Sequence, residues 1–125
     1  MLQFDETAFP LVFIVEKAPG ATTADQQLEQ LLAREKAFIL ITDHRPDRNE
    51  RHDQAERKAR ALFFKRIKAA LRSYCRGIIF IENGSPLPLP VRIAAQTFGL
   101  AFKISVAFVD DEEAAISQGH AFLRT

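Results

Sequence analysis

The residues of this chain that could do chemistry directly follow two of its apolar segments. Asp43-His44-Arg45 comes soon after Phe38–Ile41, and Asn83-Gly84-Ser85 comes soon after Ile78–Ile81. A nucleophilic Ser85 would need His44 as a base within hydrogen-bonding reach, and an oxyanion pocket beside it. Ser85 does not lie in a Gly-x-Ser-x-Gly elbow, and serine is equally common in turns. The sequence therefore favours a non-enzymatic domain, and an enzyme that uses Asp43, His44 and Ser85 stays open as an alternative.

Metal and phosphate chemistry have weaker signals. The segment 43–53 contains two Asp-His pairs, but it has no His-x-x-x-His spacing and its arginines would oppose a cation. A single cysteine, Cys75, excludes an internal disulfide and a cysteine-based zinc site. The five glycines are scattered, so no loop is glycine-rich enough to cradle a phosphate. We expect no metal and no cofactor.

The elements that must position these residues alternate along the chain. Four apolar segments predict strands over 11–15, 38–41, 78–81 and 104–109, with a short extra strand over 2–4. Helical spacing predicts helices after Thr22 or Thr23, over about 53–76, from about residue 90, and from Asp110 or Asp111. We expect Gly77 to end the second helix as its C-cap, and Gly99 to lie near the end of the third. The fourth strand is more polar and is expected nearer an edge.

This order predicts a single α/β domain over residues 1–125. Its sheet should be one layer of four or five strands, largely parallel or mixed, with helices on its faces. In such a fold, ligands bind beyond the carboxyl ends of the strands. A small-molecule or lipid pocket there would gather the following residues: Thr22, Thr23, Asp43, His44, Arg45, Asn83 and Ser85. Leu87 and Leu89, within a proline-rich connection, are expected to anchor that connection to the core.

The helix over 53–76 is unusually basic. Residues 45–76 hold eleven Lys or Arg and four Asp or Glu, a net charge of +7, whereas the whole chain is +1. Such a face could contact nucleic acid or an acidic partner, but no exposed aromatic residues are interleaved for base stacking. Arg60 projects within the apolar side of this helix, and Phe64 beside Phe63 makes that side wider than one sheet contact needs. They predict an interface with a protein partner or with a second copy in a homodimer.

No apolar segment is long enough to cross a bilayer, and the acidic residues that begin the chain do not resemble a secretory signal. We expect a cytoplasmic, bacterial protein.

The chain resembles the STAS (sulfate transporter and anti-sigma-factor antagonist), or SpoIIAA-like, domains over residues 10 to 123. The resemblance is carried by Gly20–Asp25 opening a helix, by the strand from Phe38 to Thr42 with its long following helix, and by Val109–Ala115 opening the last helix. It implies a regulatory or protein-interaction domain. Anti-sigma antagonists of this family carry a phosphorylatable serine after the strand that corresponds to Phe38–Thr42. Here no Ser or Thr lies between Thr42 and Ser73. The resemblance therefore transfers no functional residue to this chain.

Overall fold

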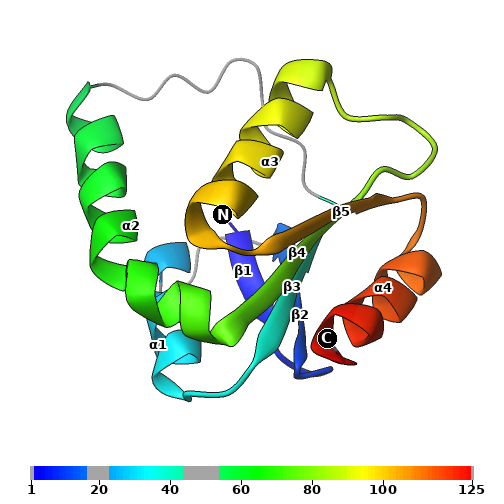
Figure 1. Cartoon of the computed structure of the whole chain (residues 1–125), viewed down its shortest axis with the longest axis horizontal. Helices are drawn as coiled ribbons and strands as arrows, with labels where there is room; N and C mark the ends of the chain where they lie inside the picture. The colour runs from blue at the N-terminus through cyan, green and yellow to red at the C-terminus, as the bar shows by residue number, and fades with distance from the viewer. Residues whose placement is uncertain (1, 17–22, 44–53, 125) are drawn as a thin grey trace.

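The computed structural model describes residues 2–16, 23–43 and 54–124 (Figure 1). Strands and helices alternate after an opening pair of strands. In chain order they are β1 (Leu2–Asp5), β2 (Leu11–Glu16), α1 (Ala24–Ala33), β3 (Phe38–Thr42), α2 (Gln54–Tyr74), β4 (Cys75–Ile81), α3 (Leu89–Phe102), β5 (Ser105–Val109) and α4 (Glu112–Arg124).

The five strands form one sheet in the order β1-β2-β3-β4-β5. Strand β1 is antiparallel to β2, and the remaining neighbours are parallel. The predicted α/β class, the mixed sheet and the short first strand are therefore confirmed. The fourth predicted strand, β5, is an edge strand, as its composition indicated.

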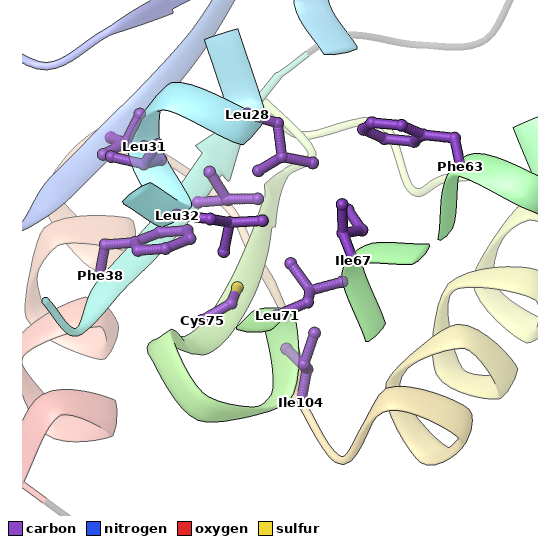
Figure 2. Close-up of a cluster of buried hydrophobic side chains, with 11 residues drawn as sticks. Leu28, Leu31, Leu32, Phe38, Phe63, Ile67, Leu71, Cys75 and Ile104 are labelled. Carbon is purple, nitrogen blue, oxygen red and sulfur yellow. The ribbon is translucent and has the colours of Figure 1, made fainter. Parts of the chain in front are cut away.

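Alternation along the strands divides the core into two layers. Val12, Phe38 and Leu40 face α1, α2 and α3, whose buried side chains include Leu31 and Leu71 (Figure 2). Their neighbours in the same strands pack on the opposite face against α4, the one described helix on that side (Figure 1). Continuous apolar segments are what a strand needs when both of its faces are covered.

Helix α1 begins as predicted, because Thr23 forms a capping box with Gln26. The Thr23 hydroxyl accepts from the Gln26 backbone N–H, and the Gln26 side chain accepts from the Thr23 backbone N–H. In α4 the Asp111 carboxylate accepts from the Ala114 backbone N–H at 2.8 Å, which caps the helix in the same way.

One of the two predictions about glycine is wrong. Gly77 does not end α2, since α2 ends at Tyr74 and Gly77 lies buried inside β4. A Cβ at Gly77 would lie 2.5 Å from the Phe122 ring of α4. Gly99 lies near the end of α3 as predicted, where a Cβ would lie 2.6 Å from Val106 of β5, and α3 is capped by Lys103 in a left-handed conformation. Both glycines permit close packing of a helix against a strand. In the sequence, a glycine with this role looks the same as a glycine that caps a helix.

In the part of the chain that the structure describes, every helix is either too short or too polar to span a membrane.

Candidate functional site

The carboxyl edge of the sheet holds an acid-rimmed hollow. Its volume is about 380 Å³, and it lies on the α4 side of β2 and β3. Phe13, Val15 and Ile41 contribute to its apolar lining, while Asp43 and Glu112 contribute carboxylates. The hollow is within the size range of small-molecule pockets. Of the residues predicted to form a ligand site, Asp43 is the one that lines this hollow among those the structure describes.

The other residues of that predicted site that the structure describes do not join Asp43. Thr23 is the cap of α1, while Asn83 and Ser85 belong to the turn that follows β4, and none of these three lines the hollow. Thr22, His44 and Arg45 lie outside the described residues. The catalytic pairing of His44 with Ser85 therefore stays a prediction.

The turn after β4 is organised by Glu82, which sequence reasoning missed. Its carboxylate is buried, accepts from the Leu87 backbone N–H at 2.7 Å, and pairs with the Arg92 guanidinium of α3 at 2.9 Å. Asn83 and Gly84 both have left-handed φ angles, and the Ser85 N–H donates to the Glu82 carbonyl at 3.0 Å. The feature of the sequence that could have indicated this role is a glutamate placed directly after the apolar segment Ile78–Ile81. Asn83 and Ser85 thus have a structural role in holding this connection.

Cysteine and metal chemistry find little support in the described residues. Burial raises the pKa of the Cys75 thiol to about 12, so the thiol stays protonated and is a poor nucleophile at neutral pH. Within residues 2–16, 23–43 and 54–124, no group of three or more His, Cys, Asp or Glu side chains is placed to hold a metal ion.

Helix α2 presents its basic residues to solvent. All residues from 54 to 62 are exposed, and in Figure 1 this first half of α2 stands clear of the sheet. The exposed cations along the helix are Arg57, Lys58, Arg60, Lys65, Arg66, Lys68 and Arg72, followed by Arg76 at the start of β4. Arg66 forms an ion pair with Glu29 of α1.

The two residues predicted to form an interface on α2 have different surroundings. Arg60 is exposed. Phe64 is half-buried, and its ring meets the rings of Phe98 and Phe102 edge-on, with centroids 5.5 and 5.8 Å away. The extra apolar width of α2 therefore serves, at Phe64, to join α2 to α3.

A second surface lies along α3 and β5. Leu89, Ile93 and Leu100 are 68%, 52% and 83% exposed, and their spacing places them on one side of α3. A groove of about 680 Å³ lies beside the end of α3 and the start of β5, lined in part by Gln96, Leu100 and Val106. We call this region the α3–β5 surface. Its signal in the sequence was a helix that is apolar on nearly all sides, which one sheet contact cannot bury.

The prediction for the proline-rich connection is half confirmed. Leu87 is buried, but Leu89 is exposed and belongs to the α3–β5 surface.

No family model, no curated protein and no solved structure matches this chain. The resemblance to STAS domains therefore stays a prediction.

Proposed function

We propose that this chain is a cytoplasmic, non-enzymatic interaction domain of STAS-like type that binds another polypeptide through the α3–β5 surface. The observation that carries the proposal is Leu100, which is 83% exposed beside the groove along an edge strand. A neighbouring chain can bury such side chains and pair with the backbone of the strand. The Glu82–Arg92 pair supports this role, because it holds the start of α3 on the sheet.

Photo-crosslinking tests this proposal. A photo-reactive amino acid replaces Leu100 in one variant and Leu62, which is 57% exposed on α2, in a matched control. In cells that express each variant, Leu100 should give a discrete polypeptide adduct, identified by mass spectrometry, and Leu62 should not. The adduct should disappear when Ile93→Glu is added, since burying a charge between Leu89 and Leu100 on this surface is unfavourable. Equal labelling at Leu62 and Leu100 would refute the proposal.

The exposed charge of α2 favours a second function, which is binding of an acidic protein or nucleic acid. The observation behind it is the set of basic side chains on residues 57–76, which are exposed over the length of the helix. Affinity for a short oligonucleotide, used as the probe, should fall steeply with salt because bound counterions are released. Charge reversal at Lys65 and Lys68 should weaken it, while reversal of Lys36, an exposed cation outside α2, should not. Salt-independent binding would exclude this function.

A further inference from the structure

We infer that the polypeptide bound at the α3–β5 surface is a second copy of this chain, paired with the first through antiparallel β5 strands about a twofold axis at Ala107. The inference rests on the proposed function, because it names the partner for the same surface.

The two edges of the sheet are not equivalent. At the β1 edge, the Gln27 side chain of α1 accepts from the Phe4 backbone N–H at 2.8 Å, so this edge is partly covered by the molecule itself. At the opposite edge, β5 is a five-residue strand of sequence Ser-Val-Ala-Phe-Val. It contains no proline, lysine or glycine, the residues with which proteins usually discourage pairing at an edge. Strand β5 is therefore the edge suited to an added strand.

The charges at the two ends of β5 select a second copy in the antiparallel direction. Lys103 precedes the strand, Asp110 and Asp111 follow it, and all three are exposed. Pairing about Ala107 places each Lys103 opposite the Asp110–Asp111 pair of the second copy, at both ends of the ribbon. Parallel pairing would instead place like charges together.

The same register matches the apolar side chains. Val106 of each copy lies opposite Phe108 of the other, an aromatic and β-branched pair that is favourable across strands. In the single chain, the Phe108 ring is stacked on Phe80 and lies under Arg92, so it is already held in place for that contact. The partner thus finds an ordered surface, which lowers the entropy lost on binding.

In this dimer the exposed apolar side chains of α3 lie beside the paired strands. Gly99 packs against Val106, so the helical turn before it, around Gln96, lies level with Ala107 and with the twofold axis. Ile93 and Leu100 lie on either side of Gln96. Ile93 of each copy therefore approaches Leu100 of the other copy. The second copy then covers the groove beside β5. The strand and helix contacts together exclude water from side chains that a single chain exposes.

Sedimentation equilibrium and light scattering of the purified full chain test this inference. At about 0.1 mM the chain should be a dimer, as expected for a Kd of about 10 µM or lower. Leu100→Glu should raise the dimer Kd at least about tenfold, because it buries two charges at the centre of the interface. Its exposure in the single chain means that folding should survive, which circular dichroism checks. Lys36→Glu, at an exposed cation between α1 and β3, is the matched control and should leave the Kd unchanged.

A charge swap tests the register. Lys103→Glu should raise the Kd about tenfold, because it gathers three acidic side chains at each end of the ribbon. Adding Asp110→Lys should recover part of that loss, since it replaces one of the two facing carboxylates with a cation while Asp111 keeps its charge. Asp110 is used because Asp111 caps α4 through Ala114. A monomer at about 0.1 mM, or a dimer insensitive to Leu100→Glu and to the swap, would overturn the inference. A Leu100 adduct with a different protein would also overturn it while leaving the proposed function standing.

Discussion

Replacing Glu82 removes the group that ties β4 to α3. Its carboxylate is 7% exposed and holds both the Leu87 backbone N–H, at 2.7 Å, and the Arg92 guanidinium, at 2.9 Å. In Glu82→Ala, the buried N–H of Leu87 and the guanidinium both lose their acceptor. In Glu82→Gln, the amide oxygen can still accept from Leu87, and only the charge facing Arg92 is lost.

The expected cost follows from these contacts. A hydrogen bond to a charged group is worth about 1.5–3 kcal/mol, and breaking a buried ion pair costs about 3–5 kcal/mol. The Arg92 side chain is 37% exposed, so water can solvate part of its charge once the partner is gone. We therefore expect Glu82→Ala to lower the free energy of unfolding by about 2–4 kcal/mol, and Glu82→Gln by about 1–2 kcal/mol.

Urea unfolding followed by circular dichroism measures these changes, with Glu113→Gln, an exposed carboxylate of α4, as the control. Hydrogen exchange at the Leu87 amide gives an independent readout. Exchange there should accelerate strongly in Glu82→Ala and much less in Glu82→Gln. If Glu82→Ala changed stability by no more than the control, about 0.5 kcal/mol, the role assigned to Glu82 would be wrong.

Three further predictions follow from burial and close packing. Burial raises the pKa of the Cys75 thiol from 9.0 to about 12, so above about pH 9 the unfolded chain releases a proton that the folded chain keeps. Stability should then fall by about 1.4 kcal/mol per pH unit from this group, and urea titrations of Cys75→Ala should lack that part of the slope. Gly99→Ala should destabilise by about 1–2 kcal/mol despite better helix propensity, because its Cβ would lie 2.7 Å from the Ile104 carbonyl; a thermal midpoint at or above wild type would contradict this. In denaturant titrations Leu71→Ala, in the core, should cost about 2–5 kcal/mol, while Leu62→Ala, on the surface, should cost under about 0.5 kcal/mol.

The strands were predictable because their signal is local. A segment such as Phe38–Ile41 is apolar at every position, and only burial on both faces stabilises such a strand. The Thr23 cap was predictable for the same reason, since its partner Gln26 lies three residues away. The Gly77 prediction failed because a distant element decides the role of that residue, since Phe122 of α4 approaches it. The position of Gly99 near the end of α3 was predictable, but its close packing against Val106 was not.

The residues of the candidate site were likewise predictable from the sequence only in part. Sequence reasoning placed Asp43 at the carboxyl edge of the sheet, where the structure has it lining the acid-rimmed hollow. It did not find Glu82, because a glutamate after a strand is usually solvated, and its importance depends on Arg92 ten residues away. It also assigned Leu89 to the core, although that side chain is exposed.

By itself, then, the sequence determined the class of fold, the order of its elements and the basic charge of α2, because each depends on neighbours within one helical turn or along one strand. Only the tertiary structure decided that β5 is an edge strand of the described sheet and that Leu89, Ile93 and Leu100 of α3 stay exposed. The order of strands and the crossing of a helix over a sheet depend on contacts between residues far apart in the chain. Periodicity shows that a side of α3 is apolar, but burial depends on how many neighbours the fold supplies to cover it.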